Sequence, residues 1–301
     1  MSNALSHMVQ CPAAVVDFEL ALLHHGWTCH GALAAQGLMN TELGLALFGL
    51  NAHRTKPPAL HLVSFAEGAF VPRIGTFRDE VRAMDRFASV KVCGLSDLEP
   101  EFARRHARIL TPDVRGVGWW LWKPHLILAA LNAANEADIV VYADVGCVFN
   151  AIAVDRFDEY VEMCRASRQG VLAFSQVWLE SHWNKMDLPH RLGVAGDVQI
   201  MSTGQLWAGC ILLRKSRRSI DLVRKWLSVC EEQNYRFIDD APSEARNHPR
   251  FQEHRHDQSV FSLIAKQRGV ATTFAEAALP NQRVLARLAD TVPIRKLKRM
   301  K

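Results

Sequence analysis

The sequence of 301 residues lacks the signatures of several large classes of protein. No apolar run is long enough to cross a bilayer, which takes about 20 residues. The N-terminus has neither the basic start nor the continuous apolar region of a signal peptide. Internal repeats and low-complexity segments are also absent. We therefore expect an ordinary globular protein that stays in the cytoplasm and has no integral membrane segment.

Cysteine is present, but without the spacing that makes it structural. The number is odd, the spacing is irregular, and no C-x-x-C occurs, which argues against a disulfide framework and against a structural zinc site. Several of these residues stand in apolar runs, where cysteine behaves as a small hydrophobe. The positions are Cys11, Cys29, Cys93, Cys147, Cys164, Cys210 and Cys230. This usage fits a reducing cytoplasm.

The common nucleotide-binding fingerprints are missing as well. The chain contains no G-x-G-x-x-G and no G-x-x-x-x-G-K-[ST], so it offers neither a dinucleotide fingerprint nor a P-loop. A sugar nucleotidyltransferase would need a glycine-rich phosphate loop with a basic residue after the first strand. Residues 66–68 after the strand predicted at 59–65 read Ala-Glu-Gly, which is not such a loop. That enzyme class is therefore a weak alternative.

Charge of one sign is not in large excess, since the formal net charge is only +5. Much of it lies in the segment 286–301, through Arg295, Lys296, Lys298, Arg299 and Lys301. A basic tail can bind an anionic membrane surface, and it can equally be a solvated chain end. We expect no nucleic-acid partner.

The most informative stretch is 116–150, rich in glycine and tryptophan at its start. Proline in the first turn predicts a helix over 124–136, and a continuous β-prone run predicts a buried strand over 138–144. The strand ends at Asp144-Val145-Gly146. Ligands of open α/β sheets bind at the carboxyl ends of strands, where a carboxylate can hold a divalent cation. The alternative for Asp144 is a turn or capping residue.

Alternating strand and helix patterns indicate an α/β domain from residue 58 to about 285. The predicted strands are 59–65, 89–94, 138–144, 170–174 and 205–214, and the predicted helices are 73–87, 101–110, 124–136, 154–166, 219–230 and 259–267. Residues 175–187 have no clean period and are rich in Trp, His, Glu and Lys, which favours a site loop. We read His106 as structural.

The first 57 residues form an extension of unknown role, with helices predicted at 15–25 and 41–50. Between them lie His24, His25, Cys29 and His30. These four could ligate a metal, but histidines next to a helix end are more often surface caps.

A second polar group precedes the helix predicted at 259–267. His256 and Asp257 stand side by side there, and such a pair can serve as ligand and base. A polar cluster at a helix N-terminus can also hold an anion. The plainer alternative is that Asp257 caps the helix.

Basic and aromatic side chains near these positions are candidates for the remaining contacts. Cations that could reach phosphates are Arg73, Lys123, Lys185 and Arg255, each of which could equally be an ordinary surface charge. Trp119, Trp120 and Trp122 could stack on a sugar or base, or could belong to the core.

The chain resembles bacterial polysaccharide-biosynthesis glycosyltransferases of the GT-A type, and more distantly the yeast Golgi galactosyl- and mannosyltransferases. The resemblance extends over about residues 60–269 and leaves 1–57 outside. Its elements occur in the family's order: LHLVSFAEG, GVGWWLWKP, VVYADVG, the ESHWNKMD region, LWAGCILLRKS and EHRHDQSVFSLI.

This resemblance implies a Rossmann-type α/β fold with a mixed, mostly parallel sheet flanked by helices. It implies a nucleotide-activated sugar as donor and a glycan or lipid-linked molecule as acceptor. We assign donor binding to Ser64, Phe65, Arg73, Lys123, Asp144, Gly146 and Gly209. We assign acceptor binding to Trp183, Lys185 and Glu180. Catalysis is assigned to Asp257 and to His256. Asp257 would be the base if the enzyme inverts, whereas a retaining mechanism would need no such base. A Mn²⁺ or Mg²⁺ ion would be held by Asp144 and His256, although Gly146 departs from the two-carboxylate pattern.

The sequence therefore predicts a hexosyltransferase-like enzyme of capsule or lipopolysaccharide assembly, peripheral at the inner membrane through its basic tail. The alternative of a different class is a non-catalytic carbohydrate-binding or scaffolding protein on the same fold. Retained donor binding without turnover would distinguish the second from the first.

Overall fold

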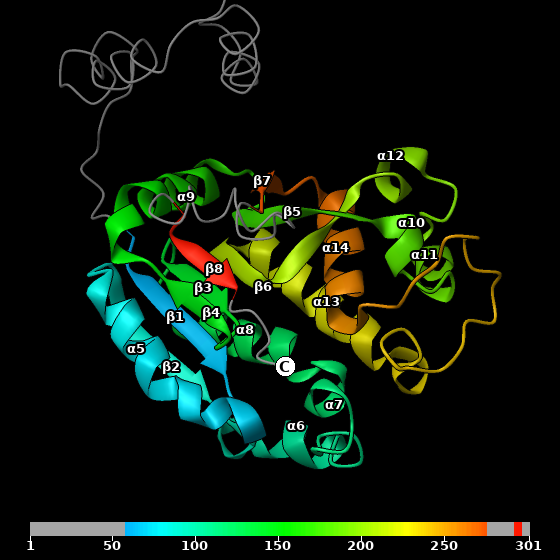
Figure 1. Ribbon diagram of the computed structural model, residues 1–301, viewed down its shortest axis with the longest axis horizontal. Helices are drawn as coiled ribbons and strands as arrows, with labels where there is room; N and C mark the ends of the chain where they lie inside the picture. The colour runs from blue at the N-terminus through cyan, green and yellow to red at the C-terminus, as the bar shows by residue number, and fades with distance from the viewer. Residues whose placement is uncertain (1–57, 276–291, 297–301) are drawn as a thin grey trace, which may run out of the picture. The chain divides into compact units, whose positions relative to one another are not determined.

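The computed structural model describes residues 58–275 and 292–296, and these are coloured in Figure 1. The predicted helices at 15–25 and 41–50 lie outside the described residues. So do the histidine and cysteine group of residues 24–30 and the last five residues of the basic tail.

A six-stranded sheet forms the centre of this domain, with the strand order β2-β1-β3-β6-β5-β7. Strand β6 is antiparallel to both of its neighbours, β3 and β5, and the other three pairings are parallel. The strands are β1 (Leu60–Phe65), β2 (Phe87–Cys93), β3 (Ile139–Ala143), β5 (Val171–Leu179), β6 (Gly204–Arg214) and β7 (Ala271–Phe274). The predicted α/β architecture, a mixed and mostly parallel sheet flanked by helices, is confirmed.

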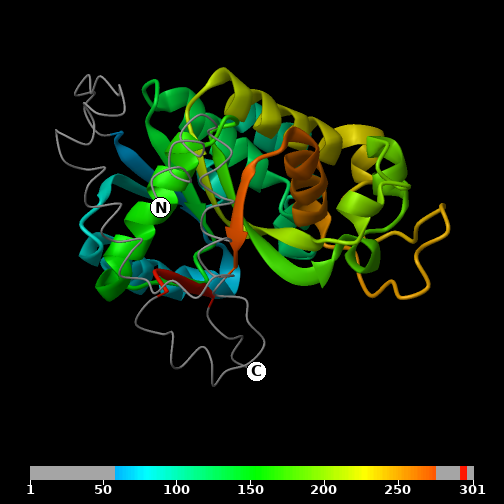
Figure 2. The ribbon, with the colours of Figure 1, turned by 90° about the horizontal axis from the view of Figure 1, so that it is seen from above.

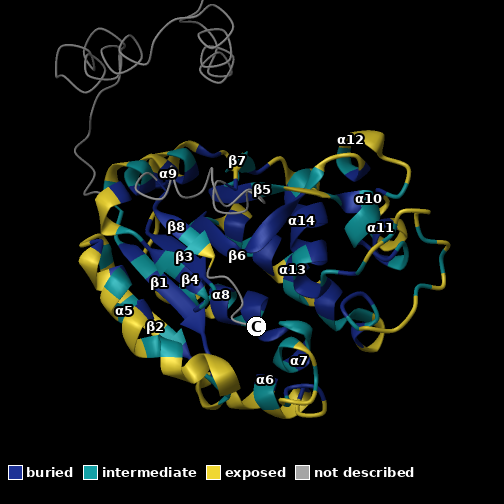
Figure 3. Ribbon diagram, in the orientation of Figure 1, coloured by how far each residue is buried: buried dark blue, intermediate teal, exposed yellow. Residues whose placement is uncertain are grey.

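Strand β3 is apolar and buried along its whole length because helices cover both faces of the sheet. In β3, Val140 and Tyr142 pack into one apolar layer, and Ile139 and Val141 pack into the other. This alternation follows from the two-residue period of a strand. Figure 3 shows the result, since the strands at the centre are dark blue and the outer helix faces are yellow.

The helices divide between the two faces. Helices α8 and α13 lie on the face of Tyr142, whereas α5 and α9 lie on the opposite face, as the view from above shows (Figure 2). The helices are α5 (Ile74–Ala83), α6 (Pro100–Arg105), α7 (Gly116–Trp119), α8 (Trp122–Ala133), α9 (Val154–Ala166), α10 (Glu180–Trp183), α11 (Asp187–Leu192), α12 (Val198–Met201), α13 (Arg217–Tyr235) and α14 (His256–Arg268). Short 3-10 turns are η1 (Gly68–Arg73), η2 (Leu95–Asp97) and η3 (Ala151–Ala153).

Two predicted segments differ in a way that matters for the site. The loop expected over 175–187 is largely regular, because β5 continues to Leu179 and α10 follows directly. The helix expected at 259–267 begins at His256. The polar pair at 256 and 257 therefore lies inside the first turn of α14 and not before it. Both differences arise where tertiary burial overrides a weak local pattern.

A second sheet of two strands lies next to the carboxyl end of β3. Strand β4 (Cys147–Phe149) pairs antiparallel with β8 (Ile294–Lys296), and Cys147 stands opposite Lys296. Part of the segment predicted as a basic tail is therefore a strand beside the main sheet. No helix among the described residues is long and apolar enough to span a bilayer.

Candidate active site

Asp144 follows the last residue of β3, and its side chain lies among polar partners. The two-residue period of the strand puts it on the same face as Tyr142. The Tyr142 hydroxyl donates a hydrogen bond to Asp144 Oδ1 at 2.6 Å, and the Asp144 side chain is 34% exposed. This carboxylate is therefore fixed on one side and open on the other, as a ligand-binding group at a strand end must be.

Lys123 lies opposite Asp144 in the first turn of α8. Its side chain is only 4% exposed, and Nζ lies 3.4 Å from Asp144 Oδ1 and 3.2 Å from Asp257 Oδ2. Nζ also donates a hydrogen bond to the carbonyl of Ala208, in β6, at 3.2 Å. Burial acts to lower the pKa of Lys123, but the two carboxylates outweigh it and raise the pKa above its usual range. Lys123 is therefore a fixed positive charge that joins β3, β6 and α14.

Asp257 supplies the second carboxylate from the first turn of α14. Its backbone carbonyl accepts a hydrogen bond from Trp226 Nε1 at 2.9 Å, which anchors the turn to α13. Burial raises the pKa of the Asp257 carboxyl to about 7; Lys123 opposes this rise and Asp144 adds to it. The residue that precedes the helix is Arg255, and no side chain caps it. The capping alternative for Asp257 is therefore wrong, because this side chain turns inward to Lys123.

The raised pKa of Asp257 predicts a pH dependence of stability. The native state holds this proton up to about pH 7, whereas the unfolded chain releases it near 3.8. The native state thus binds more protons across that window, so the contribution of this group to stability is lost as pH rises from 4 to 7. A pKa raised by this much corresponds to about 4 kcal/mol. Urea unfolding of the wild type and Asp257→Asn at several pH values should show that the variant lacks this decline; parallel curves would contradict it.

The backbone that leads into Lys123 is unusual. Val117, Trp119 and Trp120 all have positive φ, at 55°, 50° and 61°. Each such non-glycine residue costs on the order of 1–3 kcal/mol, and such strain clusters at functional sites. Gly116 belongs to the same turn, where a side chain would overlap the Trp120 indole. Helix α8 begins directly after this turn, and Lys123 in its first turn contacts Asp144.

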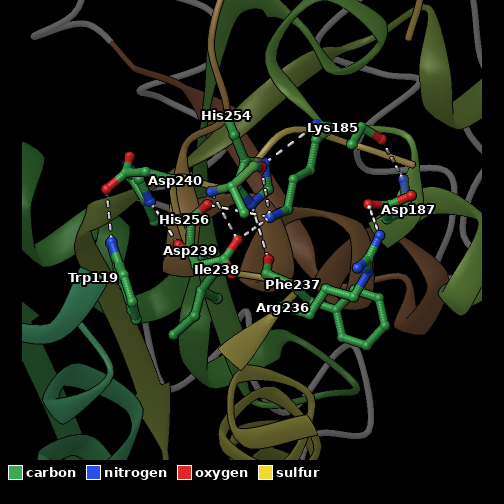
Figure 4. A network of polar contacts seen from close by, with 12 residues as sticks. Trp119, Lys185, Asp187, Arg236, Phe237, Ile238, Asp239, Asp240, His254 and His256 are labelled. Carbon is green, nitrogen blue, oxygen red and sulfur yellow. Dashed lines mark hydrogen bonds and ion pairs between the residues drawn. The ribbon is translucent and has the colours of Figure 1, made fainter. Parts of the chain in front are cut away.

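A second polar network fixes residues 237–241 beside the site (Figure 4). His254 Nε2 donates to the carbonyl of Phe237 at 2.9 Å, and His256 Nδ1 donates to that of Ile238 at 2.7 Å. Burial lowers the pKa of both histidines, which keeps them neutral. In the same network, Trp119 Nε1 donates to Asp240 Oδ2 at 2.7 Å. The histidines thus hold a backbone segment whose side chains reach the tryptophan turn.

The predicted donor residues near β1 are held by partners within the fold. Ser64 is fully buried, and the ring of Phe65 stacks on Trp122 with centroids 3.9 Å apart. Arg73 donates to Glu80 Oε2 at 2.6 Å and to the Cys147 carbonyl at 3.1 Å. Ser64 and Phe65 are buried, and Arg73 is held by Glu80 and Cys147, so this geometry does not favour their contact with a donor.

The three predicted acceptor residues differ in their burial. Glu180 is fully buried and pairs with Lys266, with Nζ 2.7 Å from Oε1. Lys185 is 2% exposed and forms an ion pair with Asp239. Trp183 alone is half-buried, with the Arg255 guanidinium 5.2 Å from its ring centroid. Glu180 and Lys185 therefore have structural partners that occupy them, and Trp183 stays a candidate.

The residues around Asp144 do not make a good divalent-cation site. His256, the second predicted ligand, contacts Ile238 and lies 3.7 Å from Asp240 through Nε2. Among the described residues, no group of three or more His, Cys, Asp or Glu side chains could hold a metal ion. The lysine that lies between the two carboxylates instead compensates their charge.

Sequence reasoning missed one contributor to this geometry. The hydroxyl of Tyr142 holds Asp144, and its position two residues earlier on the same strand was the available signal. Gly209 was predicted, and its place in the structure shows why it is glycine. A Cβ there would overlap the Trp207 indole and lie 2.7 Å from Asp144 Oδ2.

No family model matches the chain, and no curated protein matches it. Among solved structures, it is similar to mouse xyloside xylosyltransferase 1 in its apo form, with a TM-score of 0.41 and 11% identity over 79% of this chain and 97% of that one. It is also similar to a glycosyltransferase involved in the glycosylation of the major capsid of PBCV-1. That match has a TM-score of 0.45 and 8% identity over 79% of this chain and 93% of that one. At these values no residue role passes from either structure to this chain.

Proposed function

We propose that this protein is a glycosyltransferase that moves a sugar from a nucleotide-activated donor to a glycan or lipid-linked acceptor. The observation that carries the proposal is the group formed by Asp144, Lys123 and Asp257 at the carboxyl end of β3. A half-exposed carboxylate beside a fixed ammonium suits a ligand that carries both phosphates and hydroxyls. The ordered sequence motifs that resemble the bacterial GT-A enzymes support the same class.

In this proposal Asp144, Lys123 and Gly209 face the donor, and Trp183 lies on the acceptor side. Asp257 is the candidate base of an inverting reaction, and a pKa of about 7 suits that role at neutral pH. Its side chain is 4% exposed, so the role requires that bound substrate draws Lys123 away from Oδ2. His256 positions the first turn of α14. A place in surface polysaccharide assembly near the inner membrane is part of the proposal.

The test is thermal unfolding of the full chain with a panel of nucleotide sugars. A donor at about a hundred times its dissociation constant should stabilise the protein by about 2.7 kcal/mol. Free sugars and nucleoside monophosphates serve as controls, and turnover with the donor that binds is then measured by release of nucleoside diphosphate. Absence of stabilisation by every nucleotide sugar would overturn the proposal. Donor binding without turnover, together with unchanged binding in Asp257→Ala, would favour a non-catalytic carbohydrate-binding protein.

A further inference from the structure

The cation at the centre of the candidate active site is an ammonium group. Lys123 Nζ lies within 3.4 Å of one carboxylate and 3.2 Å of the other. Asp144 Oδ1 additionally accepts the Tyr142 hydroxyl hydrogen bond. A divalent cation bound to Asp144 would lie next to this ammonium and be repelled by it. The Lys123 side chain thus already supplies a positive charge next to Asp144.

The donor set for a metal is also incomplete. Mg²⁺ and Mn²⁺ prefer several oxygen ligands at close range, and Asp144 alone supplies a half-exposed carboxylate here. Space does not exclude a second one, since a Cβ at Gly146 would meet only Phe70, at 3.9 Å. Gly146 thus leaves out a carboxylate for which there is space. Lys123 supplies a positive charge next to Asp144.

A second cation lies at the same end of the sheet. Lys296 stands opposite Cys147 in the pairing of β8 with β4. Cys147 follows Asp144 by three residues in the sequence. Positive charge therefore reaches this edge from α8 and from β8.

We propose that Lys123 takes the place of the divalent cation, so that the nucleoside diphosphate part of the donor binds without a metal. The inference rests on the proposed function. Lys123 offsets part of the negative charge of Asp144 and Asp257 that would repel a diphosphate, and the diphosphate then shares the ammonium with the exposed side of Asp144. Lys296 adds favourable potential at the same edge.

Calorimetry of the full chain with UDP, GDP, ADP and CDP tests this, first in EDTA and then with Mn²⁺ or Mg²⁺. At least one diphosphate should bind in EDTA, and addition of metal should change its affinity by less than about tenfold. Titration with Mn²⁺ alone should give no tight site. Binding that appears only with metal, or a tight Mn²⁺ site on the protein alone, would overturn the inference.

Two variants make the outcome sharper. Asp144→Asn should tighten diphosphate binding severalfold in EDTA, because it removes a negative charge and frees the ammonium. Loss of that metal-free binding would show that the diphosphate needs the Asp144 carboxylate and not the freed ammonium, and would overturn the inference. Lys123→Met should lose at least about tenfold in affinity, with Lys225→Met as the control for an exposed lysine. Circular dichroism must show that each variant is folded, and Asp144→Asn keeps the test decisive if Lys123→Met is not.

The two proposals fail in different ways. If no diphosphate and no nucleotide sugar binds with or without metal, both are overturned. If binding is strong but strictly metal-dependent, the glycosyltransferase proposal stands and the role of Lys123 as the replacement cation is wrong.

Discussion

Replacement of Lys123 with methionine is expected to lower the free energy of unfolding by about 3–5 kcal/mol at pH 8, because removal of one member of a buried ion pair leaves a buried charge uncompensated. The charge concerned is that of Asp257, whose side chain is 4% exposed. Without the lysine, the pKa of this carboxyl should rise above its present value of about 7. At pH 5 the carboxyl is then protonated, so the loss of stability should be clearly smaller than at pH 8. Urea unfolding at the two pH values measures the difference.

The matched control is Lys225→Met, since Lys225 is 37% exposed and lies 3.9 Å from Glu232. A surface substitution of this kind should change stability by no more than about 0.5 kcal/mol. The double variant Lys123→Met with Asp257→Leu should recover part of the loss, because it removes the buried charge as well. An equal loss at pH 5 and pH 8 would show that the lysine acts through packing and not through Asp257.

Glu180→Ala should cost a similar amount, about 3–5 kcal/mol, because it leaves Lys266 without its buried partner. Glu180 is fully buried, and it accepts hydrogen bonds from Ser262 and Asn184 as well as from Lys266. Burial lowers the pKa of Lys266 while Glu180 raises it, so the lysine should lose its proton more readily in the variant. Thermal and urea unfolding provide the measurement.

A second variant, Glu180→Gln, separates two roles for Glu180. If this carboxylate binds an acceptor, Glu180→Gln should raise KM and leave stability nearly unchanged. If it acts as the geometry indicates, Glu180→Gln should lose stability and keep its KM for any substrate. Glu101→Ala is the control, since that carboxylate is 62% exposed in its pair with Arg105. A stability loss equal to that of the control would contradict the structural role.

Much of the fold could be predicted because a buried strand requires a continuous run of apolar residues, which is visible in the sequence. The run Ile139–Ala143 is apolar on both faces, and β3 was placed to within one residue at either end. Helix α9 occupies Val154–Ala166 as predicted. The segment 175–187 was misjudged because Glu180 and Lys185 carry charges that sequence reasoning places at the surface. Their burial depends on partners 86 and 54 residues away, which no local pattern reveals.

The sequence indicated which residues belong to the candidate site, but not which of them contact one another. Asp144, Lys123 and Asp257 were all singled out, for separate reasons. The contacts between them depend on how α8 and α14 pack on the sheet. Arg73 was singled out on the same grounds as Lys123, yet it pairs with Glu80. Arg73 and Lys123 differ in the carboxylates that they contact, and those contacts are set by the tertiary structure.

By itself the sequence determined the α/β class, the central buried strand, and the glycine at position 146 that takes the place of a carboxylate. The class and the strand follow from composition and period, which are local properties of the chain, and the meaning of Gly146 follows from the resemblance to the GT-A enzymes. Only the tertiary structure decided that Lys123 lies between two carboxylates and that Glu180 is buried. It also decided that Lys296 stands in a strand beside Cys147. Charge pairing and burial arise between segments far apart in sequence, and the free energy of a charged group depends on those neighbours and on its access to water.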